Sequence, residues 1–184
     1  IHGYPDNHHV WDGVAELLSQ RYNVVAYDVR GAGESSTPAS RSGYRLDQLV
    51  ADIDTVIGSL GVAQVHLLAH DWGSVQAWSA VTGDTVVAKV ASFTSISGPH
   101  ARHIGQFIRS SRTPKDIGKV ARQASSSVYV GFFLIPGLPE LFFRSGLGAK
   151  VVERLERFGR SSTLSRRTAA PRSISDYVNG LNLY

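Results

Sequence analysis

The first hundred residues alternate between short apolar runs and longer amphipathic stretches. Three runs have the length and composition of buried parallel strands, at residues 21–28, 64–69 and 88–96. Between the first two runs, apolar side chains recur every three or four residues and predict a helix with one buried face, which Gly61 ends: Leu46, Leu49, Val50, Ile53, Val56, Ile57 and Leu60. Shorter helices are predicted over 11–18 and after residue 71. This alternation predicts an α/β fold in which helices flank a parallel sheet.

The strand and helix rhythm ends after Pro99. Arg-rich helical stretches follow, then a hydrophobic run at 128–143 that is interrupted by Pro136, Gly137 and Pro139, and then a Ser/Arg-rich segment at 160–175. We interpret residues 1–100 as part of an α/β core and residues 101–184 as a truncated helical cap, or lid. Ile1 to Gly3 read as the end of a buried strand that enters a turn, so we expect a fragment that lacks the first strands and the C-terminal part of its fold.

Composition favours a folded protein, because 42% of the residues are hydrophobic and 18% are charged. The absence of cysteine excludes disulfides and thiolate chemistry. Residues 1–100 carry a net charge of −5 and residues 101–184 one of +9. The simplest interpretation is a basic solvated face, and the alternative is contact between the basic cap and a membrane surface or acidic lipid. No nucleic-acid-binding motif accompanies the charge, so nucleic acid is not an expected partner. No apolar stretch is long enough to span a bilayer. We therefore expect a cytoplasmic protein, and the alternative is a protein that associates with a membrane surface.

The segment from Leu67 to Ser74, Leu-Leu-Ala-His-Asp-Trp-Gly-Ser, joins a predicted strand to a predicted helix. Ala69 and Gly73 stand two positions on either side of Asp71, which is the spacing that a tight strand-to-helix turn with a raised central side chain requires. A carboxylate at that position can attack an electrophilic carbon and form an ester. The following helix would favour its negative charge. The alternative is that Asp71 only caps the helix.

Two other segments have turn chemistry. In His2-Gly3-Tyr4-Pro5, the glycine permits a sharp turn after a strand, and the proline fixes the direction of the chain and is compatible with a cis peptide bond. The segment Asp-Val-Arg-Gly-Ala-Gly-Glu-Ser at 28–35 follows a predicted strand. It lacks the third glycine and the spacing of a dinucleotide-binding loop, so nucleotide binding is not favoured.

In this order and spacing, the three segments resemble the α/β-hydrolase superfamily, and within it the epoxide hydrolase and haloalkane dehalogenase branch. The resemblance implies that Asp71 is the nucleophile and that the backbone N–H groups of Tyr4 and Trp72 form an oxyanion hole. It also implies a supporting role for the surrounding turns, at His2, Gly3, Pro5, Ala69, His70 and Gly73.

Two tyrosines of the cap resemble the lid tyrosines by which epoxide hydrolases hydrogen-bond the epoxide oxygen. Tyr129 stands in Tyr-x-x-x-Phe-x-x-Pro-Gly, and Tyr184 in Leu-Asn-x-Tyr. The alternative for each is ordinary packing. The resemblance implies hydrolysis of a small apolar epoxide to a diol through an ester of Asp71, with no metal and no organic cofactor.

The same resemblance places the base histidine and its orienting acid outside this chain. None of the seven histidines fits that role, so we expect the chain alone to be inactive. Residues 90–99 are similar to an actinobacterial subgroup in which an epoxide-hydrolase-like domain precedes a short-chain dehydrogenase domain, so a fused C-terminal dehydrogenase is a further expectation.

The competing interpretations are a haloalkane dehalogenase, in which the Trp72 N–H would bind halide, another hydrolase of the superfamily, and a non-catalytic lipid-binding domain.

Overall fold

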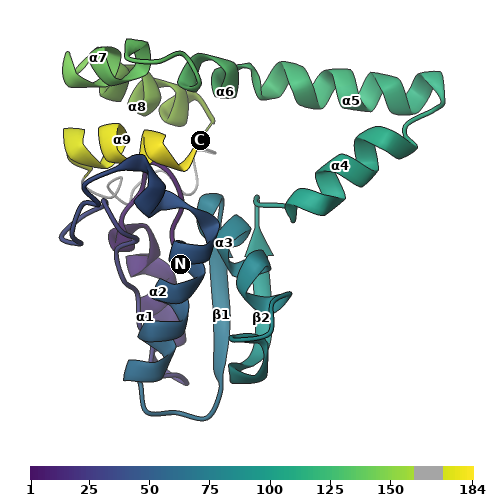
Figure 1. The fold of residues 1–184 in the computed structure, drawn as a ribbon. Helices are drawn as coiled ribbons and strands as arrows, with labels where there is room; N and C mark the ends of the chain where they lie inside the picture. Colours follow the sequence, from purple (N-terminus) through teal and green to yellow (C-terminus); the bar gives the residue numbers. More distant parts are fainter. Residues whose placement is uncertain (160–171) are drawn as a thin grey trace.

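A computed structural model describes residues 1–159 and 172–184 (Figure 1). Its sheet consists of two parallel strands, β1 (Val65–His70) and β2 (Val90–Ile96), with Leu67 opposite Phe93. Ile1 lies along the other edge of β1, because its backbone nitrogen donates to the Leu68 carbonyl at 2.6 Å and its carbonyl accepts from the His70 N–H at 3.1 Å. The first residues therefore continue the sheet before they enter a turn, as the sequence predicts.

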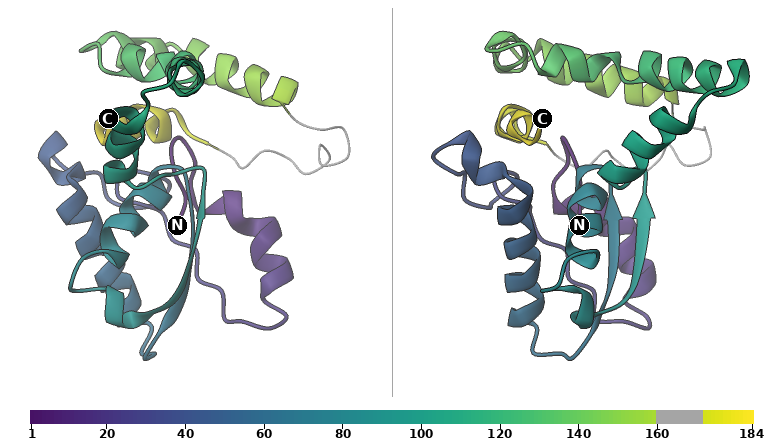
Figure 2. Two further views of the ribbon diagram at one scale, coloured as in Figure 1. Left: turned by 90° about the vertical axis from the view of Figure 1, so that its right-hand side faces the viewer. Right: turned by 45° about the vertical axis from the view of Figure 1, so that its right-hand side comes forward.

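Helices cover both faces of this sheet. α2 (Leu46–Ser59) and α3 (Trp72–Val81) pack on one face, and α1 (Asp12–Leu18) lies on the other (Figure 2). The predicted apolar stripe of α2 is confirmed, since Leu49, Ile53 and Ile57 are buried. The core beneath it is small and combines side chains from two helices, a strand and a loop: Ile53, Ile57, Leu67, Ala80 and Val86. Burial of each large aliphatic side chain contributes roughly 1.5–3 kcal/mol.

The strand expected at residues 21–28 is not formed. These residues are extended, but no described strand pairs with them, and Tyr22, Val24 and Val25 are exposed. An apolar run indicates that a segment is buried only when a neighbouring strand and a covering layer are present. The helix α1 likewise exposes Val14, Leu17 and Leu18. The outer edge of β2 is also unpaired within the described part of the chain.

The described residues after His100 are helical, as the sequence predicts. They form α4 (Ala101–Ser110), α5 (Pro114–Ser126), α6 (Val128–Phe133), α7 (Leu138–Arg144), α8 (Leu147–Gly159) and α9 (Ile174–Gly180). Short 3-10 helices lie at His8–Trp11 (η1), Arg41–Tyr44 (η2), Val87–Lys89 (η3) and Leu181–Leu183 (η4). Most of the Ser/Arg-rich segment, residues 160–171, lies outside the described residues. α4 and α5 form an arm that projects sideways, and α6 to α8 return above the C-terminal ends of the strands (Figure 1).

The helix α9 lies between these upper helices and the sheet (Figure 1). Ser173 and Asp176 form a capping box that starts it. Below α9, the Gly33 N–H donates to Asp176 Oδ1 at 2.7 Å. Above it, the Tyr177 ring stacks on Phe143 of α7 with centroids 5.1 Å apart. These contacts fix α9, and with it the C-terminal Tyr184, over the tips of the strands.

Candidate active site

Asp71 stands in a strained turn at the tip of β1. Its backbone has φ 53° and ψ −124°, in a region that non-glycine residues rarely adopt and that costs about 1–3 kcal/mol. The Asp71 N–H donates to the Ile96 carbonyl at the end of β2, at 2.9 Å, which helps to hold the turn. Although Asp71 occupies the N-cap position of α3, its side chain makes no capping hydrogen bond. The turn therefore presents the carboxylate above the sheet instead of using it as a cap.

Small residues around Asp71 leave no room for a side chain. A Cβ atom on Gly3 would lie 2.5 Å from Asp71 Cβ and 2.6 Å from Asp71 Oδ1. A Cβ atom on Gly73 would lie 2.6 Å from the Ile1 carbonyl oxygen, and Ala69 is fully buried. The spacing of small residues around the turn thus has the steric basis that the sequence suggested.

Two further residues support the turn and were missed in the sequence. The buried hydroxyl of Ser74 donates to the Ala69 carbonyl at 2.9 Å and accepts from the Ile96 N–H at 3.2 Å, so it joins the tips of both strands. A Cβ atom on Gly98 would clash with the Asp71 carbonyl and with Ser74. Serine and glycine are common in loops, so neither residue gave a specific signal.

The turn at residues 2–5 brings a donor to the carboxylate. The Tyr4 N–H donates to Asp71 Oδ1 at 3.0 Å, and the Tyr4–Pro5 peptide bond is cis. Trp72 is the first residue of α3, where backbone N–H groups have no acceptor within the helix. The Tyr4 N–H thus already bonds one carboxylate oxygen, and the Trp72 N–H, next in the chain to Asp71, has no acceptor within its helix, so the two are candidates for an oxyanion hole.

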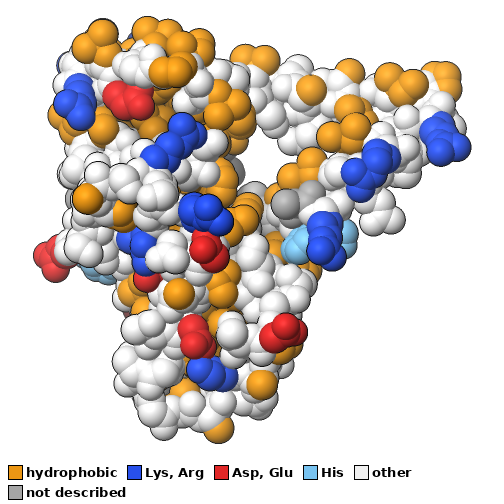
Figure 3. Space-filling model, in the orientation of Figure 1, with side chains coloured by type: hydrophobic (Ala, Val, Ile, Leu, Met, Phe, Trp, Pro, Cys, Tyr) orange, Lys and Arg blue, Asp and Glu red, His pale blue; other side chains and the backbone are white. Residues whose placement is uncertain are grey.

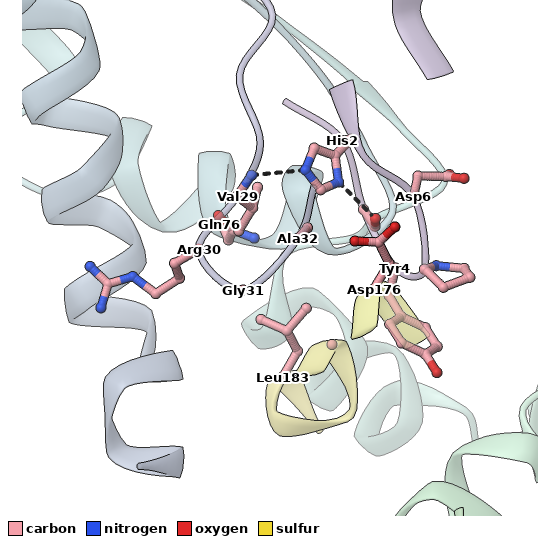
Figure 4. Close-up of a pocket in the computed structure, with 13 residues that line it drawn as sticks. His2, Tyr4, Asp6, Val29, Arg30, Gly31, Ala32, Gln76, Asp176 and Leu183 are labelled. Carbon is pink, nitrogen blue, oxygen red and sulfur yellow. Dashed lines mark hydrogen bonds between the residues drawn. The ribbon is translucent and has the colours of Figure 1, made fainter. Parts of the chain in front are cut away.

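His2 has a structural role below this turn. Its Nε2 accepts from the Val29 N–H at 2.8 Å, so its Nδ1 carries the proton and donates to the Gly3 carbonyl at 3.0 Å (Figure 4). Burial lowers the pKa of His2, which keeps the ring neutral. Both ring nitrogens are engaged, so His2 serves to join the turn to the loop after residue 28.

Asp71 is not among the residues that line the pocket of Figure 4. Its walls come from the 2–6 turn, the 29–32 loop, Gln76 and the C-terminal segment. A volume of about 20 Å³ is enough for roughly one water molecule. It is too small for an organic substrate, and we do not place the reaction there.

Tyr184 lies close to the turn around Asp71. Its ring centroid is 5.1 Å from that of Trp72 and 5.6 Å from that of Tyr4, both in edge-to-face geometry. Burial raises the pKa of the Tyr184 phenol; the neighbouring Trp72 lowers this pKa in part, whereas the charge of Asp71 and the nearby Tyr129 raise it. The phenol therefore remains protonated and able to donate a hydrogen bond.

Tyr129 projects from α6 and is half exposed. Phe133 of the same helix contacts both candidate phenols, so Tyr129 and Tyr184 lie on one aromatic cluster although they are 55 positions apart in the sequence. The Tyr129 ring contacts Phe133, one turn later on the same helix, at 5.4 Å. Ring contacts thus run from Tyr129 through Phe133 to Tyr184, and from Tyr184 to Trp72, the residue next to Asp71.

The loop after residue 28 has its backbone donors in use. The Gly31 N–H donates to the Ser36 carbonyl at 3.0 Å, and the Gly33 N–H donates to Asp176. Asp28 accepts from the N–H of His8 at 2.7 Å and from that of Glu34 at 3.0 Å. Although burial alone would raise the pKa of Asp28, these bonds hold it below its ordinary value. The loop is thus internally bonded, with few donors left for a phosphate.

A buried ion-pair network lies behind the turn. Arg172 donates through Nε to Asp6 Oδ1 at 2.7 Å and through Nη1 to Glu156 of α8 at 2.6 Å. The side chains of Arg172 and Asp6 are only 10% and 6% exposed. Although burial alone would lower the pKa of Arg172, the neighbouring carboxylates raise it. This network ties the turn that holds Tyr4 to α8 and to the residues just before α9.

Metal sites and membrane spans each require a recognisable group of residues. No group of three or more His, Cys, Asp or Glu side chains is arranged to hold a metal ion among residues 1–159 and 172–184. In the same part of the chain, no helix is both long enough and apolar enough to cross a bilayer.

The fold and this turn define a class of protein. The family described as the alpha/beta hydrolase fold matches residues 1–127, and the chain belongs to that family. Over 181 residues it is 36% identical to the Probable oxidoreductase EphD of Mycobacterium tuberculosis (strain ATCC 25618 / H37Rv), a match that covers 92% of this chain and 31% of that protein. It is also 36% identical over 144 residues to Epoxide hydrolase 4 of Mus musculus, covering 78% of this chain and 37% of that one.

Solved epoxide hydrolases have a similar structure. A mutant of an epoxide hydrolase from Bacillus megaterium superposes with a TM-score of 0.71 at 25% identity, covering 99% of this chain and 62% of that one. Epoxide hydrolase VrEH1 from Vigna radiata superposes with a TM-score of 0.67 at 27% identity, covering 100% and 62%. The chain is thus an α/β-hydrolase related to epoxide hydrolases, and it spans about a third of the length of these curated relatives.

Proposed function

We propose that this chain forms the nucleophile and lid of an epoxide hydrolase that opens an apolar epoxide to a diol through a covalent ester of Asp71. The observation that carries the proposal is the hydrogen bond from the Tyr4 N–H to one carboxylate oxygen, Oδ1, while the Tyr184 phenol lies nearby, against Trp72. A carboxylate held in this way presents its other oxygen, Oδ2, to a substrate beneath the lid.

In the first step, Asp71 Oδ2 attacks an epoxide carbon. A carbon–oxygen ester bond forms, the carbon–oxygen bond of the ring breaks, and the departing oxygen takes a proton from a phenol. Tyr129 and Tyr184 would donate hydrogen bonds to that oxygen. Its negative charge develops only as the ring opens, so these donors stabilise the transition state more than the bound epoxide. The raised pKa of Tyr184 keeps its proton in place before the reaction.

In the second step, water attacks the carbonyl carbon of the ester. The negative charge of the tetrahedral intermediate then falls on Oδ1, the oxygen that already accepts from the Tyr4 N–H, with the Trp72 N–H as the second donor. Collapse of the intermediate breaks the ester bond, and the diol leaves with a proton that the base took from the water. The carboxyl group left behind loses its own proton, which returns to the phenolate formed in the first step, so that the carboxylate and the phenol are both restored. This step needs a base to activate the water. We place that base and its orienting acid in the part of the full-length protein outside these residues, so this chain alone should form the ester without hydrolysing it.

The decisive experiment uses the full-length protein with an epoxide and a chloroalkane in parallel. We expect Asp71→Asn to abolish diol formation, Tyr129→Phe to reduce it about 10-fold or more, and the remote, exposed Tyr22→Phe to leave it unchanged. Halide release that persists in Tyr129→Phe, without diol formation by the parent protein, would instead identify a dehalogenase. Mass spectrometry of Asp71-containing peptides after a single turnover tests the ester directly.

The division of the chain is part of this proposal. We assign residues 1–100 to a partial hydrolase core and residues 101–184 to the lid. The hydrogen bond from Gly33 to Asp176 crosses that boundary and would hold the lid in register with the core. The name of the mycobacterial relative, an oxidoreductase, supports a fused dehydrogenase domain in the full-length protein. Nicotinamide-dependent oxidation of an alcohol by that protein would test this part.

The arm of α4 and α5 gives the lipid-contact alternative its support. It exposes Ile104, Phe107 and Ile108, α4 carries Arg102 and Arg109, and basic side chains line the arm (Figure 3). Such a surface suits an anionic membrane interface. Co-sedimentation of the full-length protein with anionic vesicles at low and high salt tests this contact. A protein that stays in the supernatant at both salt concentrations would exclude it.

A further inference from the structure

Phe133 occupies the centre of the aromatic cluster above the nucleophile. Its ring centroid lies 5.4 Å from that of Tyr129, 5.1 Å from that of Tyr184 and 5.5 Å from that of Tyr4. All three contacts are edge-to-face, a preferred geometry for aromatic pairs. Among the described residues, no other ring contacts both candidate phenols and the residue whose N–H holds Asp71.

The contacts arise from three separate parts of the fold. Phe133 and Tyr129 are four residues apart on α6, so their side chains meet on one helix face. Tyr184 follows η4, at the other end of the lid sequence, and its ring also packs against Trp72. The Tyr184 ring is therefore held between Trp72 of the nucleophile turn and Phe133 of the lid.

We infer that Phe133 is a positioning residue, which sets the separation and orientation of the Tyr129 and Tyr184 phenols over Asp71. The inference rests on the proposed function for its catalytic consequence, but the contacts do not depend on that function. A phenylalanine has no proton to donate, so it acts only through its neighbours. Hydrogen bonds from hydroxyl groups weaken outside a narrow range of distances, and a displacement of about 1 Å at a reacting centre can cost roughly 100-fold in rate.

The adjacent Phe132 provides a matched control. Its ring packs against Phe133 at 5.8 Å and Phe142 at 5.7 Å, and neither of these contacts involves a phenol. Phe132→Leu and Phe133→Leu remove the same atoms from consecutive positions of one helix. A general loss of lid packing would affect both variants, whereas a loss of phenol position would affect only the second.

The experiment measures kcat, KM and the single-turnover rate of ester formation for the full-length protein with styrene oxide. We expect Phe133→Leu to lower the rate of ester formation and kcat about 10-fold or more with KM changed less than about threefold. Phe132→Leu should stay within about threefold of the parent protein in both constants, and Phe133→Tyr, which keeps the ring, should restore most of the rate. If Phe133→Leu does not fold, Phe133→Met, which fills similar space without a ring, takes its place.

A second readout does not require turnover. The titration of Tyr184 at alkaline pH is followed by tyrosinate absorbance. For the parent protein and for each leucine variant, the absorbance of the same protein carrying Tyr184→Phe is subtracted, which leaves the signal of Tyr184. We expect Phe133→Leu to shift this titration to lower pH, because a displaced phenol gains contact with water, and Phe132→Leu to leave it unchanged.

Equal effects of the two leucine substitutions on both readouts would overturn the inference, as would a loss confined to KM with an unchanged titration. Failure of the proposed function has a different signature. In that case the parent protein forms neither ester nor diol, and the titration alone decides whether Phe133 positions the phenol.

Discussion

Substitution of Gly3 by alanine tests whether the turn at residues 2–5 sets the position of the nucleophile. The added Cβ would lie 2.5 Å from Asp71 Cβ, whereas ordinary contacts begin at 3.4 Å, so one of the two segments must move by about 0.9 Å. Such a movement would lengthen the Tyr4 N–H to Asp71 Oδ1 distance from 3.0 Å to about 3.9 Å, beyond the range of a hydrogen bond.

The magnitude follows from the loss of that bond. Removal of one oxyanion-hole donor costs about 100- to 1000-fold in kcat, and overpacking costs about 1–3 kcal/mol of the free energy of unfolding. We therefore expect Gly3→Ala in the full-length protein to remain folded but to lose at least about 100-fold in kcat. Stopped-flow turnover of an epoxide and urea unfolding measure the two quantities separately.

The control is Gly58→Ala in α2. No atom lies within 4 Å of the Cβ that it would add, and alanine is favoured over glycine inside a helix by about 0.5–1 kcal/mol. This variant should be slightly more stable and fully active. A folded Gly3→Ala protein with kcat within about threefold of the parent would refute the assignment of Tyr4 to the oxyanion hole.

Three other predictions follow from the charges and phenols around the site. Arg172→Leu leaves Asp6 buried without its cation and should lower the free energy of unfolding by about 3–5 kcal/mol. Arg45→Leu, at an exposed ion pair, should change the free energy of unfolding by less than about 1 kcal/mol. Urea unfolding of both variants measures the difference. The pKa of Asp28 is lowered in the folded chain, so ionised Asp28 stabilises the fold above the ordinary carboxyl pKa, and this stabilisation is lost as pH falls through the pKa of the folded state. Asp28→Asn should therefore flatten the dependence of the free energy of unfolding on pH between about pH 5 and pH 2. Because burial raises the pKa of Tyr184, its phenol should stay protonated above pH 10, where free tyrosine ionises. The tyrosinate difference spectrum between the parent protein and Tyr184→Phe measures this ionisation, and a midpoint near pH 10 would contradict the prediction.

Local pattern was sufficient to predict the elements that pack on one another within the chain. The helix predicted at 46–60 is α2, and the runs at 64–69 and 88–96 are β1 and β2 within two residues. α2 and β1 bury apolar side chains in the core, and β2 pairs with β1 and packs the partly buried Val90 and Phe93 against the same core. The run at 21–28 has the same composition but no paired neighbour among the described strands, so composition alone misled the prediction.

The candidate site divides in the same way. The turn around Asp71 is a local motif with a steric requirement at each small residue, and the sequence predicts it with the surrounding turn at Gly3. The bonds that hold the lid are different, since Asp6 and Arg172 are 166 residues apart and carry no shared periodicity. Phe133 and Ser74 stand inside motifs that the sequence shows, but it gives them no role, because their roles come from neighbours that only the folded chain brings together.

The unpaired outer edge of β2 has a practical consequence for work with these 184 residues by themselves. A row of free backbone donors and acceptors, next to the exposed Ile96, is a template for strand addition. We expect a preparation of this chain to form concentration-dependent oligomers. Biochemistry on the isolated polypeptide would then report on self-association as much as on catalysis, so light scattering should precede any kinetic measurement.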